Sequence, residues 1–189
     1  MPAFIIDETR HNAGMDRRSE NAMKEPLTLV PYDPHWPRRF EALATRASAA
    51  LSPLPVRIEH VGSTSIPGLS AKTIIDLDVV ADPADVPEAV RRLSEIGYVH
   101  KGDQGLAGRE ALLWPPRERQ HRLYVCRADS PALHEHILFR DFLRANPEEV
   151  KQYERLKRAL AARFADDRVA YQAGKASFID AIMARIANG

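Results

Sequence analysis

The segment EHVGSTSIPGLSAKTIIDLDVV, at residues 59–80, contains two strand patterns separated by a turn-rich stretch. The first strand is expected over 56–61. The second is expected over 74–80, where the residues are apolar except for Asp76 and Asp78. Because side chains alternate along a strand, both aspartates should project from the same face of a sheet.

The turn and the aspartates together indicate a site for phosphate and metal. Two carboxylates on one strand face repel each other and are costly to bury unless a cation neutralises them, and oxygen ligands of this kind suit Mg²⁺. Upstream, Gly62 lets the backbone approach a phosphate, and the Ser63 hydroxyl can donate a hydrogen bond to it. A phosphate-holding turn followed by a metal-holding pair of acids is what metal-assisted nucleotidyl transfer requires.

A purely structural reading of the same residues is the alternative. A Gly-Ser pair is most often only a turn, and an Asp-x-Asp pattern is most often a solvated strand face or a cap. Here the two aspartates interrupt an apolar run from Ile74 to Val80, where a structural strand would carry apolar or neutral residues. The combination therefore favours a functional site.

The rest of the chain predicts an α+β fold. Further strands are expected over 27–30, 98–100, 110–114 and 122–126. Helices are expected to begin at Asp33-Pro34, Asp82-Pro83, Ser130-Pro131 and Asn146-Pro147, with a last helix over 168–187. We therefore expect a mobile extension over 1–26, an α+β core over 27–128, and a three-helix section over 129–189 packed on the core.

Composition narrows the function classes. The chain has 189 residues, no apolar run long enough for a membrane span, and a net charge of +1, which argues against a large nucleic-acid footprint. The single cysteine, Cys126, excludes a multi-cysteine zinc site and points to a reducing cytoplasm. A cytoplasmic protein with a local cationic pocket remains compatible with these numbers.

A longer pattern around the turn resembles the signature of the GrpB-like family. It consists of HVGSTSIPGL at 60–69, Ala71-Lys72 and Ile75-Asp76, and similar blocks include FRDFLR at 139–144. That family belongs to the nucleotidyltransferase superfamily, so the resemblance implies a DNA-polymerase-β-like, mixed-sheet head. It also implies that Gly62 and Ser63 hold a triphosphate, and that Asp76 and Asp78 are catalytic and bind a divalent metal, here Mg²⁺.

One departure from the superfamily pattern leaves two functions open. Active members usually add a third carboxylate on a neighbouring strand, but the candidate strand, HRLYV at 121–125, contains no acid. The first hypothesis is a Mg²⁺-dependent nucleotidyltransferase that binds a nucleoside triphosphate and an unknown acceptor. The second is a non-catalytic nucleotide or metabolite sensor on the same fold. An RNA-modifying enzyme is a weaker third.

Further candidate residues lie outside the central motif. Ser65 and Lys72 are predicted to contact phosphates, as are Arg109 and His121, for which a solvated loop face is the alternative. The C-terminal helices supply Arg140, Lys157 and Lys175, which fall on otherwise apolar helical faces. Such cations often extend to water along the core surface, but here we predict that they face the aspartates and neutralise an anionic ligand. His134 and His136 are too close together for a zinc pair on a helix.

Overall fold

The computed structural model describes residues 27–114 and 121–188. A central sheet of five strands comprises β1 (Arg57–Val61), β2 (Ile75–Ala81), β3 (Val99–His100), β4 (Arg109–Leu113) and β5 (His121–Arg127). The spatial order is β1-β2-β5-β4-β3, with β2 and β5 parallel and every other neighbouring pair antiparallel. The expected mixed sheet and α+β class are therefore confirmed. The predicted extension over 1–26 lies outside the described residues.

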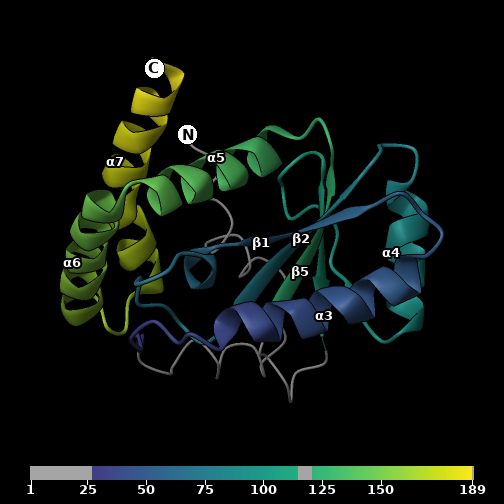
Figure 1. The fold of residues 1–189 in the computed structure, drawn as a ribbon, viewed down its shortest axis with the longest axis horizontal. Coiled ribbons are helices and arrows are strands. Elements are labelled where there is room, and N and C mark those ends of the chain that lie inside the picture. The colour runs from purple at the N-terminus through teal and green to yellow at the C-terminus, as the bar shows by residue number, and fades with distance from the viewer. Residues whose placement is uncertain (1–26, 115–120, 189) are drawn as a thin grey trace.

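Helices cover both faces of this sheet. Those of the described part are α3 (Trp36–Leu51), α4 (Val86–Glu95), α5 (Pro131–Ala145), α6 (Pro147–Arg163) and α7 (Arg168–Ala187), with one short 3₁₀ turn, η2 (Ser63–Ser65). In Figure 1, α3 and α4 lie below and beside the strands, α5 crosses above them, and α6 and α7 stand together at one side. None of these helices is long and apolar enough to cross a membrane.

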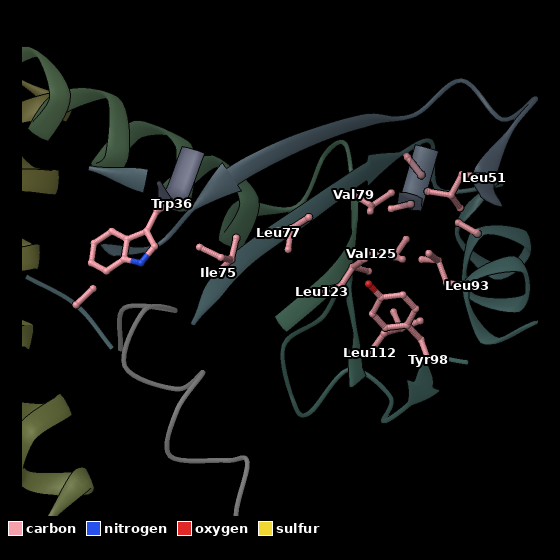
Figure 2. Close-up of a cluster of buried hydrophobic side chains, with 14 residues drawn as sticks. Trp36, Leu51, Ile75, Leu77, Val79, Leu93, Tyr98, Leu112, Leu123 and Val125 are labelled. Atoms are coloured by element: carbon pink, nitrogen blue, oxygen red, sulfur yellow. The ribbon is translucent and has the colours of Figure 1, made fainter. Parts of the chain in front are cut away.

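The main hydrophobic core lies between the sheet and helices α3 and α4. Ile75, Leu77 and Val79 of β2 alternate along one face, and all three are fully buried. Figure 2 shows these side chains meeting residues of β5, α3 and α4, with Trp36 at one end of the cluster. Each fully buried side chain of this size contributes roughly 1.5–3 kcal/mol to folding, so this face anchors β2 in place.

A second apolar cluster joins the C-terminal helices to the segment that follows β1. Ile66 and Leu69, just after the turn, are buried against Phe139 and Leu143 of α5 and Ile179 of α7. The predicted starts at Ser130-Pro131 and Asn146-Pro147 are confirmed, since Pro131 and Pro147 open α5 and α6, and the last helix spans 168–187 as expected. The three helices thus enclose the turn from the side opposite α3.

Three predicted boundaries are wrong. The helices expected at Asp33-Pro34 and Asp82-Pro83 begin two and three residues later, because Asp33 and Asp82 accept turn hydrogen bonds through their carbonyls before α3 and α4 start. A second proline, Pro37 or Pro87, then opens each helix. The strand expected over 27–30 is reduced to a single antiparallel bridge, in which Val30 and Ala71 exchange backbone hydrogen bonds, while the N–H of Leu27 donates instead to the carbonyl of Ala165.

Candidate functional site

The second face of β2 carries the two aspartates, as the alternation predicted. Parallel pairing places Arg122 of β5 beside Asp76, and Tyr124 beside Asp78. The Nη1 atom of Arg122 is 3.8 Å from Oδ1 of Asp76, and both side chains are 22% exposed. At the position where a neighbouring strand could have offered a third carboxylate, this chain therefore offers a guanidinium.

The Gly-Ser turn lies directly against Asp76. Gly62 has a φ of +71°, a conformation that disfavours any side chain, and a Cβ atom built there would be 2.4 Å from Oδ2 of Asp76. This close approach is the structural requirement for glycine at the turn. It also shows that the predicted phosphate turn and the first aspartate share one site.

Two adjoining pockets open around this point, and we call them pocket A and pocket B. Pocket A is lined by Val61, Gly62, Ser63, Ile66, Asp76, Arg122, Tyr124, His136, Phe139, Arg140, Tyr153, Gln172 and Lys175. Pocket B is lined by Leu29, Ser63, Thr64, Ala71, Lys72, Ile74, Asp76, Arg122, Lys157, Tyr171 and Lys175. Because Ser63, Asp76, Arg122 and Lys175 belong to both, the two pockets form one continuous cleft.

The lysines of the cleft come from separate elements and converge on the turn. Lys157 of α6 is only 2% exposed, and its ammonium donates to Oγ of Ser63 at 2.8 Å and to the carbonyl of Ser70. It therefore does not extend to water. Lys72 and Lys175 both lie near the ring of Tyr171, with Nζ atoms 6.0 and 4.7 Å from its centroid.

Arg140 connects α5 to the first strand. Its guanidinium donates to a carboxylate oxygen of Glu59 and, at 3.1 Å, to the carbonyl of His60, and it also contacts Asp141. Burial raises the pKa of Glu59, but hydrogen bonds from Arg140 and Arg57 lower it by more, so the net pKa is below its usual range. Arg140 is therefore both a lining residue of pocket A and an anchor for the helix.

Asp78 has a different environment from Asp76. It is fully buried, and its Oδ2 is 2.9 Å from Nδ1 of His136, whose side chain is 10% exposed and lines pocket A. From the sequence, His136 was rejected as a zinc ligand, and its contact with Asp78 was not predicted. A signal was available, because His136 and Arg140 are four residues apart on one helical face.

Four predicted site residues do not line the cleft, and one of them is Asp78, which is fully buried. The hydroxyl of Ser65 donates to the carbonyl of Gly62 at 2.6 Å, so it closes the turn. Arg109 is buried, with its guanidinium carbon 4.4 Å from the ring centroid of Tyr124. His121 projects from the opposite face of β5 to Arg122, where its Nε2 is 2.8 Å from the hydroxyl of Tyr98.

The aspartates partly fit the Mg²⁺ site that the sequence suggests. Oδ1 of Asp78 is buried and has no hydrogen-bond partner within residues 27–114 and 121–188, so it is the oxygen that could serve as a ligand to a cation. In the same described ranges, no group of three or more His, Cys, Asp and Glu side chains is arranged to hold a metal. A metal here would therefore need Asp76, Asp78 and ligand oxygens together, which is a common arrangement for Mg²⁺.

Known proteins resemble this chain over most of its length. It is 37% identical over 165 residues to the UPF0157 protein of Deinococcus radiodurans, covering 86% of this chain and 84% of that one. It is 34% identical over 157 residues to the UPF0157 protein YqkA of Bacillus subtilis, covering 82% of this chain but only 46% of that protein. The chain thus spans about half the length of the Bacillus relative.

A more distant relative and a solved structure extend the comparison. The chain is 27% identical over 178 residues to the dephospho-CoA kinase of Mycolicibacterium paratuberculosis, covering 80% of this chain and 44% of that one. The crystal structure of the conserved protein GrpB from Enterococcus faecalis superposes with a TM-score of 0.75 and 33% identity, covering 84% of this chain and 96% of that one. The family model described as GrpB protein matches residues 26–185. The chain therefore belongs to the GrpB family.

Proposed function

We propose that this protein binds a nucleoside triphosphate, or a similar phosphorylated nucleotide, in the cleft formed by pockets A and B. The observation that carries the proposal is the charge around the Gly62-Ser63 turn. Pocket B is lined by four cations, Lys72, Arg122, Lys157 and Lys175, and by a single carboxylate, that of Asp76. Cations that converge in a partly buried cleft suit a polyphosphate better than a neutral ligand.

The shape and origin of the cleft support a small molecule rather than a long polymer. The cations come from the loop before β2, from β5 and from helices α6 and α7, so they enclose one point instead of forming a stripe along the surface. The net charge of the whole chain is only +1, whereas proteins that follow a nucleic-acid backbone need many phosphate contacts. The proposal therefore commits to a free nucleotide.

A specific observation also favours a catalytic role, Mg²⁺-dependent nucleotidyl transfer to an unknown acceptor. Asp76 lies at the phosphate turn, and the buried Oδ1 atom of Asp78 has no hydrogen-bond partner within the described ranges. In this role the two carboxylates would hold Mg²⁺, which would neutralise charge on the triphosphate during transfer. Arg122 beside Asp76 is the feature that instead favours a non-catalytic sensor, because it neutralises that carboxylate without a metal.

The relative named as a dephospho-CoA kinase adds one compound to the set worth testing. That name points to a phosphorylated coenzyme precursor as the substrate of that protein. Dephospho-CoA belongs in the ligand panel alongside the common nucleoside triphosphates, because it combines phosphate and nucleoside groups in one molecule.

Binding is tested by calorimetric titration of the full chain with ATP, GTP, CTP, UTP, dephospho-CoA and inorganic tripolyphosphate, each with and without Mg²⁺. We expect Lys175→Met to weaken binding of the phosphorylated probes by about tenfold or more, because it removes a cation common to both pockets. Lys151→Met, on the exposed side of α6, is the matched control and should have no effect. The proposal is wrong if no probe binds. It is also wrong if Lys175→Met binds the phosphorylated probes as tightly as the control Lys151→Met does.

Catalysis is tested separately on any nucleotide that binds. Release of pyrophosphate that requires Mg²⁺ and is lost in Asp76→Asn and Asp78→Asn would support nucleotidyl transfer. Nucleotide binding that is independent of Mg²⁺, with no release of pyrophosphate in the presence of candidate acceptors, would support the sensor instead.

A further inference from the structure

Gln172 of α7 has an amide that the protein itself does not use. The residue is 4% exposed and lines pocket A. Its Nε2 atom is buried and donates no hydrogen bond to any residue within 27–114 and 121–188. Buried amide donors are nearly always paired, so an unpaired one that lines a pocket points to an acceptor on a ligand.

The two pockets differ in chemistry around their common residues. Pocket B adds Lys72 and Lys157 to the common set, and so it is the more cationic end of the cleft. Pocket A instead adds five apolar and aromatic side chains, those of Val61, Ile66, Tyr124, Phe139 and Tyr153, together with Gly62, His136, Arg140 and Gln172. A ligand whose phosphates lie in pocket B and against the residues that line both pockets would therefore place its other end in pocket A.

The aromatic wall beside Gln172 is held in position by its own packing. The ring of Tyr153 is edge-on to Phe139, with centroids 5.6 Å apart, and it is stacked on Phe178 at 4.9 Å with an interplanar angle of 11°. Phe139 and Tyr153 are 3% and 2% exposed. A pre-formed aromatic wall with a small number of polar groups is typical of a site for a flat ring.

We infer that pocket A takes the heteroaromatic base of the nucleotide and that Gln172 determines which base is accepted. In this arrangement Nε2 donates to a ring nitrogen or carbonyl oxygen at the edge of the base, while the phosphates lie toward pocket B. The inference rests on the proposed function, because it assigns the second end of the same ligand. It names a specificity-determining residue and an orientation along the cleft.

The substitution Gln172→Leu separates this role from a structural one because only base recognition predicts a loss of selectivity among nucleotides. If the amide only fills space, leucine of similar size removes an unpaired buried donor, and the fold should be as stable as before or more stable. If the amide pairs with a base, the same variant loses selectivity among bases while remaining folded. Thermal unfolding of the variant without ligand establishes that it is folded.

The experiment titrates the full chain with ATP, GTP, CTP, UTP and inorganic tripolyphosphate. We expect the unmodified chain to bind one triphosphate about tenfold or more tightly than the others and more tightly than tripolyphosphate. Gln172→Leu should reduce that preference to about threefold or less and leave the affinity for tripolyphosphate unchanged. Gln152→Leu, at an exposed position of α6, is the matched control and should keep the preference.

Failure of this inference is distinguishable from failure of the proposed function. If the nucleoside triphosphates bind no more tightly than tripolyphosphate, pocket A is not a base-recognition site, although phosphate binding stands. The same conclusion follows if Gln172→Leu keeps the full preference among the triphosphates. If neither tripolyphosphate nor any nucleotide binds, the proposed function is wrong and this inference is wrong with it.

Discussion

The two faces of the central sheet contrast sharply, although the same strands supply both. Toward α3 and α4, strand β2 presents Ile75, Leu77 and Val79, all fully buried. Toward the C-terminal helices, the same strand presents Asp76 and Asp78, which alternate with those apolar residues. The contrast shows that one strand can anchor the fold with alternate residues and supply polar chemistry with the rest.

The polar face carries groups that folding alone does not favour. Asp78 is fully buried and has one oxygen without a hydrogen-bond partner in the described part of the chain. Lys157 of α6, which lines the cleft on this side of the sheet, is 2% exposed. Buried ionic groups of this kind are often no more stabilising than well-packed apolar residues. A ligand of the kind proposed above would account for these groups, and the apolar face provides the stability that allows them.

The largest expected effect concerns the apolar face. Leu77→Ala should lower the free energy of unfolding by about 3 to 4 kcal/mol, because it removes buried methyl groups and leaves a cavity in a face that cannot collapse freely. Chemical denaturation measures this change. The control, Leu138→Ala at a 44% exposed position of α5, should change stability by no more than about 0.5 kcal/mol. Similar losses in the two variants would remove the distinction between the faces.

His60 is an exception on the apolar face, and its titration sharpens the comparison. It is stacked on Phe40 with ring centroids 4.6 Å apart, and burial, aided by Arg144 and Arg140, lowers its pKa to about 4. The neutral form is therefore favoured in the folded state. Between pH 6.5 and 4 the unfolded chain takes up a proton that the folded chain does not, so stability should fall by up to roughly 3 kcal/mol.

Urea denaturation as a function of pH tests the role of His60. The variant His60→Gln should show a flatter decrease in stability between pH 6.5 and 4, because it lacks the titrating ring. His134→Gln, at an exposed position of α5, is the control and should follow the unmodified chain. Parallel curves for the unmodified chain and His60→Gln would mean that His60 does not stay neutral.

An intermediate effect is expected at the turn that borders the polar face. Gly62→Ala should cost about 2 kcal/mol, because the backbone conformation with a φ of +71° disfavours a side chain. Part of the cost should come from contact with the carboxylate of Asp76. In an Asp76→Ala background the same substitution should therefore cost about 1 kcal/mol less, which a double-mutant cycle measures. An equal cost in both backgrounds would show that the turn and Asp76 are not in contact.

The smallest effect concerns Ser65, which the structure places in the turn but not in the cleft lining. Ser65→Ala should cost about 1 kcal/mol of stability, because it removes the hydrogen bond to the carbonyl of Gly62. Tripolyphosphate affinity, measured by titration, should stay within about twofold of the original value. A tenfold loss of affinity would instead place the Ser65 hydroxyl on the ligand, as the sequence suggested.

Much of the fold was predictable because its signals are local. Alternation in 74–80 identified β2 and the common face of Asp76 and Asp78, and the Ser-Pro and Asn-Pro pairs located the starts of α5 and α6. The errors at α3 and α4 have a local cause too. A turn and a second proline follow each Asp-Pro pair, and composition alone does not show which proline opens the helix.

The sequence by itself determined the Gly-Ser turn, the common strand face of the two aspartates and the helical faces that carry the cations, because each depends on local periodicity or turn chemistry. Only the tertiary structure decided how they meet. The register between β2 and β5 places Arg122 beside Asp76 and turns His121 to the opposite face, and the packing of α5 brings His136 to Asp78. Those contacts join residues more than forty positions apart, so they depend on how whole elements pack and on no pattern within a single segment.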